Sequence, residues 1–76
     1  MTDRIYKIVE LVGSSPEGVD AAINGAIDRA AKTLRNLDWF EVREIRGMIV
    51  DGKVATTQVK LGVGFRVNEP GDMNQA

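Results

Sequence analysis

Apolar and polar residues alternate with different periods along the chain, and the period separates strands from a helix. The segment from Arg4 to Val12 is rich in β-branched and aromatic residues, which predicts a strand that ends at Gly13. From Val19 to about Asn36, apolar residues recur with the spacing of one helical face, which predicts an amphipathic helix. The apolar positions of this helix are Val19, Ala22, Ile23, Ala26, Ile27, Ala30, Ala31 and Leu34.

The start of the helix has its own local signal in Ser14-Ser15-Pro16-Glu17. Either serine suits the cap position, and Pro16 suits the first turn because its missing N–H has no helical partner there. Glu17 follows Ser14 at the spacing of a capping box. We therefore expect the helix to begin within this tetrapeptide.

Two further strands are predicted over Asp38–Val50 and Val54–Val67, joined by a reversal at Asp51-Gly52. The last strand alternates cleanly, and its apolar side should meet the helix. The members of that side are Ala55, Val59, Leu61, Val63, Phe65 and Val67.

The middle strand carries a break in its alternation, because Val42 and Ile45 are three positions apart. This step predicts a β-bulge near Glu44. A three-residue loop, Asp51-Gly52-Lys53, with Gly52 or its neighbour at positive φ, then sets the register. The expected pairs are Ile49 with Ala55, Arg46 with Gln58, and Trp39 with Gly64.

The order strand, helix, strand, strand predicts an α+β subunit with a three-stranded antiparallel sheet. One helix returns the chain so that the first two strands run the same way, and an all-antiparallel sheet then requires the spatial order 1-3-2. The sheet should partly wrap the helix and leave its other face uncovered. We expect one domain over residues 1–67 and a polar, mobile tail over residues 68–76.

The composition strengthens the expectation that copies of the chain associate. The chain has 76 residues and contains neither cysteine nor histidine. A domain of this size buries only about 60–65% of its unfolded surface, so a lone subunit is marginally stable. Disulfides and thiolate or imidazole metal sites are excluded, which leaves a homo-oligomer as the expected means of stabilisation.

The same composition excludes several classes of function. Without cysteine or histidine there is no thiol nucleophile and no imidazole base, and no acidic loop with metal-binding spacing is present, so no metal is expected. The net charge of −1 argues against a nucleic-acid partner. No apolar run approaches the roughly 20 residues that span a bilayer, and the first residues lack a hydrophobic signal. We expect a cytoplasmic protein without a membrane partner.

Candidate binding residues gather on the uncovered face of the predicted sheet. Trp39 offers a ring for a flat guest beside the space left by Gly62 and Gly64, and Gln58 offers donors and an acceptor to a ring edge. Arg46 and Arg66 suit a phosphate or a carbonyl group. The alternative is that Trp39 is a buried contact between subunits and Gln58 a solvated strand residue.

Distance along the strands adds a condition. Trp39 and Arg46 are seven residues apart, which is roughly 20 Å at about 3.3 Å per strand residue. One ligand ring cannot rest on Trp39 and also reach Gln58 of the same chain. A pocket that uses both residues must lie between two copies.

The sequence closely resembles the dodecins, a family of small flavin-binding proteins. The resemblance runs from Tyr6-Lys7-Ile8-Val9-Glu10-Leu11-Val12-Gly13-Ser14-Ser15 to Phe65-Arg66 and is most specific over Leu37-Asp38-Trp39-Phe40-Glu41-Val42-Arg43-Glu44-Ile45-Arg46-Gly47. It implies a hollow dodecamer of strand-helix-strand-strand subunits. Flavins would stack on Trp39, and the amide of Gln58 would bind the ring edge. FMN is favoured over riboflavin because Arg46 and Arg66 suit a phosphate. Arg46 is typical of the bacterial form, and Arg66 is carried over as a phosphate contact or an ion pair between subunits.

Some bacterial members of the family are similarly thought to hold coenzyme A on a basic part of their surface. Four cations of this chain are candidates for that role: Lys7, Arg29, Lys32 and Arg35. The alternative interpretation is a solvated, charged helix face.

Three functions compete on these grounds. The first is a non-enzymatic protein that stores and sequesters a flavin and protects it from light through contact with an indole. The second is a flavin-dependent oxidoreductase, although Gly62 and Gly64 lie in a strand and form no dinucleotide-binding fingerprint. The third is a ligand-free structural module that uses its bare sheet to form an oligomer.

Overall fold

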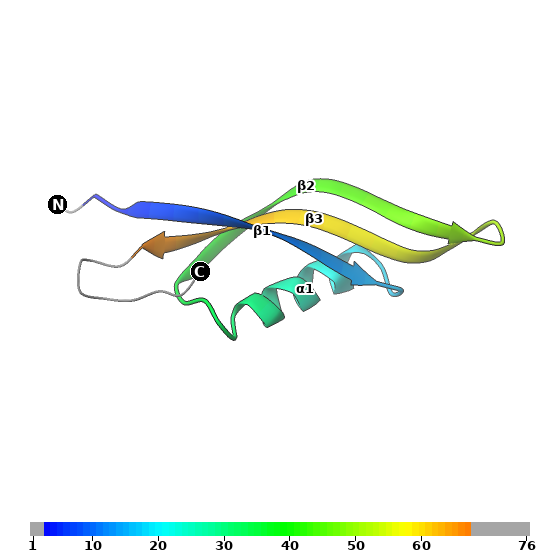
Figure 1. Ribbon diagram of the computed structural model, residues 1–76, viewed down its shortest axis with the longest axis horizontal. Coiled ribbons are helices and arrows are strands. Elements are labelled where there is room, and N and C mark those ends of the chain that lie inside the picture. Colours follow the sequence, from blue (N-terminus) through cyan, green and yellow to red (C-terminus); the bar gives the residue numbers. More distant parts are fainter. Residues whose placement is uncertain (1–2, 68–76) are drawn as a thin grey trace.

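The computed structural model describes residues 3–67 and shows one helix against a three-stranded antiparallel sheet (Figure 1). The elements are β1 (Ile5–Ser15), α1 (Val19–Ala30), β2 (Leu37–Val50) and β3 (Lys53–Val67). The strand order is β1-β3-β2, which confirms the predicted α+β fold and the central place of the last strand. The predicted tail, residues 68–76, lies outside the described residues.

The core forms where the middle of β3 meets α1. Four side chains of β3 are at most 1% exposed, namely Val59, Leu61, Val63 and Phe65. They pack with small side chains of the helix such as Ala22 and Ala30, whose size lets the helix approach the sheet closely. Ala55 and Val67 were predicted to point inward with them, but both are exposed because α1 is shorter than β3.

The prediction that β1 ends at Gly13 is wrong, because the strand continues to Ser15 and Gly13 pairs with Val59. A glycine is required at position 13 because the helix backbone comes too close for any side chain. A Cβ at Gly13 would collide with the backbone carbonyl of Ala22 in α1. The glycine therefore marks the point where the helix backbone approaches the edge strand, and no turn occurs there.

The predicted capping box does not form. Helix α1 begins at Val19 with Gly18 as its N-cap, and no side chain caps it. The Oγ of Ser15 accepts a 3.0 Å hydrogen bond from the N–H of Glu17, so this serine stabilises the turn before the helix. Because β1 extends through both serines, neither is free to act as the cap.

The helix also ends earlier than predicted, at Ala30, where the chain tightens. The N–H groups of Lys32 and Thr33 donate to carbonyls three residues back, which closes the helix with narrower turns. Asn36 then adopts a φ of 64° and directs the chain into β2. Leu34 still packs against Phe65, so the apolar spacing continues although the helix does not.

The hairpin between β2 and β3 is tighter than the predicted three-residue loop. Val50 pairs with Lys53 across a two-residue turn in which Asp51 and Gly52 have φ of 54° and 76°. Two positive φ values are the signature of a type I′ turn, and the predicted positive φ at this site is confirmed. Ile49 pairs with Val54, and Ala55 is the extra residue at a register shift, so the predicted pair of Ile49 with Ala55 is wrong.

The rest of the predicted register is confirmed. Arg46 lies opposite Gln58, and Trp39 lies opposite Gly64. A register shift between Val42 and Glu44 is the predicted bulge. Its extra residue is Arg43.

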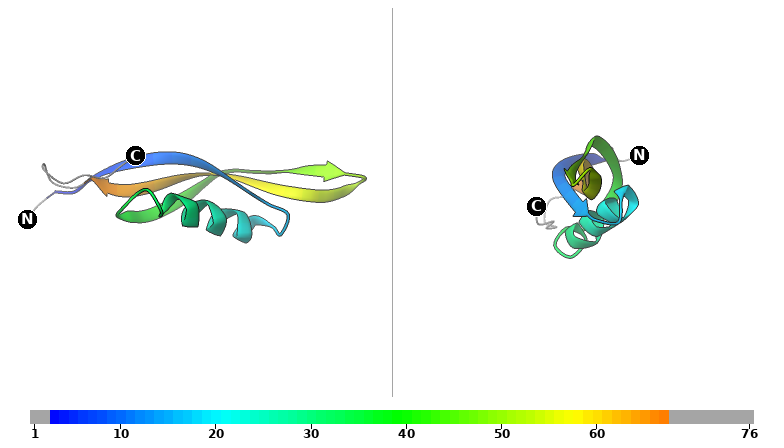
Figure 2. Two further views of the ribbon diagram at one scale, coloured as in Figure 1. Left: turned by 60° about the horizontal axis from the view of Figure 1, so that its bottom comes forward. Right: turned by 90° about the vertical axis from the view of Figure 1, so that its right-hand side faces the viewer.

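The subunit is elongated and leaves much apolar surface uncovered. It measures 55 × 20 × 14 Å, and its radius of gyration is 15.1 Å, against about 11 Å for a compact domain of this length. The sheet curves partly around α1, which packs on β1 and β3 and leaves β2 largely uncovered (Figure 2). The sheet thus partly wraps the helix, as predicted.

The far end of the β2–β3 hairpin extends beyond both β1 and α1 (Figure 1). At this end Ile49 and Val54 are 72% and 70% exposed. Within residues 3–67, no helix is long and apolar enough to cross a membrane.

Candidate functional site

The indole of Trp39 lies flat on the uncovered face of the sheet. A Cβ added to Gly64 would meet three contiguous atoms of the benzo ring, Cε2, Cζ2 and Cη2, at almost equal distances. Near-equal distances to three ring atoms place that position over the face of the ring. One face of the indole therefore rests on Gly64, and its other face points away from the sheet.

Tyr6 of β1 contacts the indole from the side of that strand. Tyr6 contacts Trp39 edge to face, with ring centroids 5.0 Å apart and planes at 71°. Tyr6 also pairs with Arg66, which places Arg66 on the same face, two residues from Gly64 along β3. The backbone of Arg66 is tied to Asn36, whose carbonyl accepts a 3.1 Å hydrogen bond from the Arg66 N–H. The side chain of Trp39 is thus held at one end of the sheet, near the predicted phosphate contact.

The space predicted beside the indole at Gly62 and Gly64 is filled by two side chains of the same chain. The indole itself occupies the space over Gly64. Over Gly62 lies the guanidinium of Arg43, with Nη2, Cζ and Nε at 2.7, 2.9 and 3.0 Å from the position of an added Cβ. Arg43 was not among the predicted site residues. The predicted bulge could have identified it, because an extra residue in a strand redirects a side chain to the other face.

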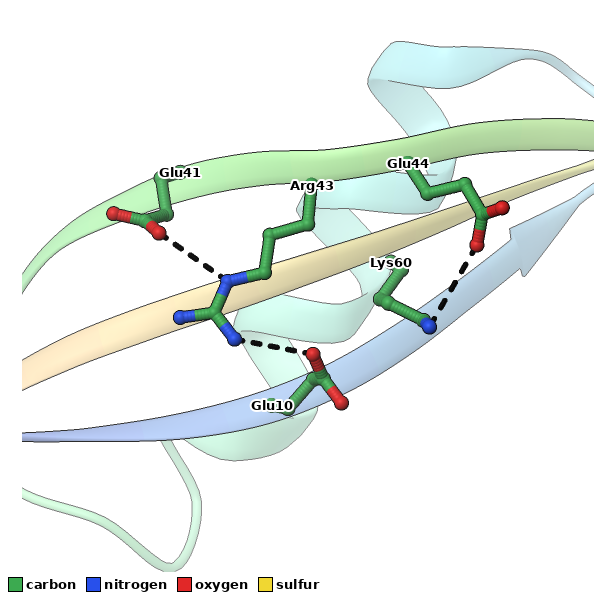
Figure 3. Close-up of polar contacts among 5 residues, drawn as sticks. All are labelled: Glu10, Glu41, Arg43, Glu44 and Lys60. Atoms are coloured by element: carbon green, nitrogen blue, oxygen red, sulfur yellow. Dashed lines mark hydrogen bonds and ion pairs between the residues drawn. The ribbon is translucent and has the colours of Figure 1, made fainter.

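Arg43 is held by a carboxylate on each side. Its Nη1 donates to Glu10 of β1 at 3.1 Å, and its Nε donates to Glu41 of β2 at 3.2 Å. Figure 3 shows the side chain crossing β3 between these partners. Hydrogen bonds to Glu10 and then to Glu41 raise the pKa of Arg43 above its ordinary value, so its positive charge persists across the usable pH range.

Arg46 and Gln58 meet each other at the other end of this face. The Nε of Arg46 donates a 3.2 Å hydrogen bond to the Oε1 of Gln58. This contact fixes which way the amide points, because its oxygen is engaged and its NH₂ group remains as the donor for a ligand. Arg46 therefore positions Gln58.

The structure keeps Trp39 and Gln58 apart within one subunit. Gly64, which carries the indole, and Gln58 are six positions apart on β3, or about 20 Å at about 3.3 Å per residue. The condition set by the sequence therefore holds in the fold. A ligand that contacts both groups has to take them from different copies.

The four cations considered for coenzyme A are all exposed. Lys7 lies opposite Phe65 on the helix-facing side of β1, while Arg29 lines a groove of about 640 Å³ between β1 and α1. Lys32 lies in the turn after the helix, and Arg35 follows it. Basic groups at a helix C-terminus interact favourably with the helix dipole, so the solvated interpretation of this surface also stands.

The described part of the chain, residues 3–67, holds no group of three or more acidic side chains that could bind a metal ion. Carboxylates of the uncovered face are engaged with cations: Glu10 and Glu41 with Arg43, and Glu44 with Lys60 at 3.7 Å. The chemistry of this face is thus that of an aromatic ring, an amide and several guanidinium groups.

Comparison with known proteins places this geometry in a family. The dodecin family model matches residues 5–68. A dodecin from Thermus thermophilus is 61% identical over 66 residues, which are 87% of this chain and 96% of that protein.

Solved structures agree with the sequence match. The structure of dodecin from Streptomyces coelicolor is 54% identical and superposes with a TM-score of 0.85, covering 91% of this chain and 99% of that one. A tryptophan-to-phenylalanine variant of the Thermus thermophilus dodecin is 58% identical with a TM-score of 0.84, covering 88% of this chain and 100% of that one.

Proposed function

The chain belongs to the dodecin family, and from that premise we propose that it is a flavin-binding storage and photoprotection protein and not an enzyme. Its ligand is FMN or riboflavin, stacked on Trp39 where subunits of a hollow dodecamer meet. Residues 1–67 form the single domain of this cytoplasmic assembly, and residues 68–76 form its tail.

The flat indole of Trp39 carries this proposal. A large aromatic ring that rests with one face on a glycine turns its other face outward, and 39% of Trp39 is exposed in the subunit. Aromatic rings favour offset stacking on such a face. A buried core tryptophan would instead be enclosed on both sides. The orientation therefore supports a site for a flat heteroaromatic guest.

The second part of the site comes from a neighbouring subunit. Gln58 lies about 20 Å from the indole of its own chain at about 3.3 Å per strand residue, so the amide that binds the ring edge belongs to another copy. Arg46 leaves the NH₂ group of Gln58 to donate to a ring carbonyl. Arg66, on the face that carries Trp39, is suited to the phosphate of FMN.

The uncovered apolar surface of the subunit supports the assembly. Large apolar side chains of β2 and the hairpin are more than half exposed, among them Ile45, Met48 and Ile49. Apolar surface of this extent, exposed along one strand and its hairpin, is typical of an interface between proteins. The proposed dodecamer would bury it and bring Trp39 of one subunit near Gln58 of another.

Trp39 also provides a physical basis for photoprotection. When bound, the flavin supplies a light-absorbing ring whose excited state is a strong electron acceptor. Trp39, held in face contact with that ring, would be placed to donate an electron to it and to accept the same electron back, so that no photochemical product would form. No group near Trp39 in residues 3–67 offers the imidazole or thiol chemistry of a second reaction.

The proposal extends to coenzyme A as a second ligand, bound through its phosphates on the surface formed by Lys7, Arg29, Lys32 and Arg35. All four side chains are exposed in the subunit and carry a positive charge. Titration with coenzyme A in the presence and absence of FMN tests this part separately.

One set of measurements separates the three functions. Titration with FMN, followed by flavin emission and by sedimentation, should show a quenched ligand on a particle far heavier than 8.3 kDa. Bleaching of the bound flavin by NADH or NADPH would favour an oxidoreductase. A heavy particle that ignores FMN would favour the ligand-free module and contradict the proposal.

A further inference from the structure

We propose that Arg43 continues the platform formed by Trp39, so that one flat three-ring ligand lies over the indole and over the guanidinium side by side. This inference rests on the proposed function, because it adds a contact to the same site. Arg43 was not among the site residues predicted from the sequence, and the proposed function assigns it no contact with the ligand.

The guanidinium lies flat on the sheet in the same way as the indole. Its Nη2, Cζ and Nε atoms are 2.7, 2.9 and 3.0 Å from the position of a Cβ on Gly62. Such similar distances to three atoms of one planar group mean that its face, and not its edge, meets the strand. Both planar groups therefore rest on glycines of β3.

The two groups are neighbours on one face. Gly62 and Gly64 are two positions apart on β3, so their Cβ positions would be about 7 Å apart on the same side of the sheet at about 3.3 Å per residue. The indole and the guanidinium thus lie next to each other at similar height. A two-ring guest centred on the indole stays on the indole, while a third fused ring extends toward Arg43 or toward Arg66.

Two carboxylates hold the guanidinium in this plane. Glu10 and Glu41 lie on either side of Gly62 in the sheet register, and each accepts one hydrogen bond from Arg43. Hydrogen bonds of a guanidinium lie in its plane, so bonds to both flanking strands keep that plane along the sheet. The side chain remains 36% exposed, which leaves its outward face for a ligand.

The β-bulge is the reason that Arg43 reaches this position. In a regular strand, consecutive side chains point to opposite faces. Glu44 pairs with Lys60 and forms an ion pair with it, while the preceding Arg43 lies over Gly62 on that same face. The extra residue therefore supplies a cation to the uncovered face without displacing the charges beside it.

The charge of the cluster points to the kind of contact. Arg43 with Glu10 and Glu41 carries a net charge of −1, which disfavours a phosphate at this position. A guanidinium that already donates in its plane to two carboxylates still attracts the π face of an aromatic ring. Arg43 is thus suited to a neutral ring, and the phosphate of FMN is left to the Arg66 side of the indole.

Two ligands that share one edge but differ in length test this inference. Lumichrome has three fused rings, and lumazine has two, with the same pyrimidinedione edge. Trp39 is the only tryptophan of the chain, so quenching of its emission reports binding at this site. Arg43→Lys keeps the charge and removes the plane. It should weaken lumichrome several-fold, by less than the roughly 30-fold of a whole cation–π contact, because an ammonium keeps the charge but cannot stack as a plane, and it should leave lumazine unchanged.

Control variants keep the result interpretable. Lys60→Gln removes the ion pair with Glu44, which lies on the same face but farther from the indole, and should leave both ligands unaffected. Glu10→Gln removes one of the two charged partners and should weaken lumichrome by less than Arg43→Lys does. Sizing of each variant confirms that the native assembly is retained.

The outcomes separate this inference from the proposed function. If the unmodified protein binds lumichrome and FMN, but Arg43→Lys leaves lumichrome unchanged or weakens both ligands equally, Arg43 is no part of the platform and the proposed function stands. If the unmodified protein binds neither lumichrome nor FMN, the proposed function fails and this inference fails with it.

Discussion

The indole of Trp39 rests face-down on the backbone of Gly64, with no side chain between ring and strand. This contact converts an ordinary outward-facing strand position into a flat aromatic platform. Any side chain at position 64 would lift the ring away from the sheet. The pairing of a large ring with the smallest residue across two strands is thus the central geometric feature of the site.

Replacement of Trp39 by alanine should weaken FMN binding by about 1–3 kcal/mol, by analogy with bases that stack on aromatic side chains. Any FMN that remains bound should regain its fluorescence, because the electron donor has been removed. Trp39→Phe is the matched control and should retain part of the affinity. Unchanged affinity and quenching in the alanine variant would contradict the stacking arrangement.

Gly64→Ala should displace the indole without altering it, since a methyl group at this position overlaps the benzo ring. We expect the free energy of unfolding, measured in urea, to fall by about 1–3 kcal/mol, as it does at other overpacked sites. Binding of FMN should weaken as well. Gly25→Ala is the control. Gly25 lies in α1 with open space around it, so alanine should stabilise the protein by about 0.5–1 kcal/mol.

Gln58→Ala should lower FMN affinity by about 0.5–1.5 kcal/mol through loss of one hydrogen bond, while bound FMN stays quenched. Affinity and emission are thereby assigned to different residues. Thr56→Ala, on the same strand two residues away, should change neither. Recovery of emission in the Gln58 variant would mean that the amide controls the ring stack as well.

Arg46→Ala should weaken FMN and riboflavin equally, because its Nε bonds to Gln58 and orients the amide. Arg66→Ala should instead weaken FMN alone, by about 1.5–3 kcal/mol for a charge-assisted hydrogen bond to phosphate. Parallel titrations of the two variants with both ligands give the comparison. If the Arg46 variant lost affinity for FMN but not for riboflavin, the phosphate would lie at Arg46 and not at Arg66.

Ile49→Asp should reduce the mass of the native particle measured by sedimentation. Ile49 is 72% exposed at the end of the hairpin, and a charge there would have to be desolvated at an interface. Asn24→Asp adds the same charge on the exposed side of α1 and should leave the mass unchanged. If the particle of the Ile49 variant kept its full mass, Ile49 would lie outside the contacts between subunits.

Local patterns in the sequence were sufficient for the topology and for most of the register. The skipped alternation between Val42 and Ile45 located the bulge, and the pairs of Arg46 with Gln58 and Trp39 with Gly64 followed from it. These predictions succeeded because strand periodicity is a short-range property of the chain. Trp39 and Gln58 were placed on one face for the same reason.

The errors occurred where a contact between distant segments decides the local structure. Gly13 looked like the end of a strand, but it makes room for the carbonyl of Ala22 in the helix. The serines looked like helix caps, but the pairing of β1 with β3 extends through them. At Gly13 the packing of α1 on the sheet outweighed a local preference, and at the serines the pairing of β1 with β3 did.

By itself, the sequence determined the order of the elements, the antiparallel sheet, the bulge and the pairing of Trp39 with Gly64. Only the tertiary structure decided that the indole lies flat and that Arg43 fills the space over Gly62 between Glu10 and Glu41. The physical reason is that alternation fixes which face a side chain occupies. The direction in which it then lies depends on partners from other strands.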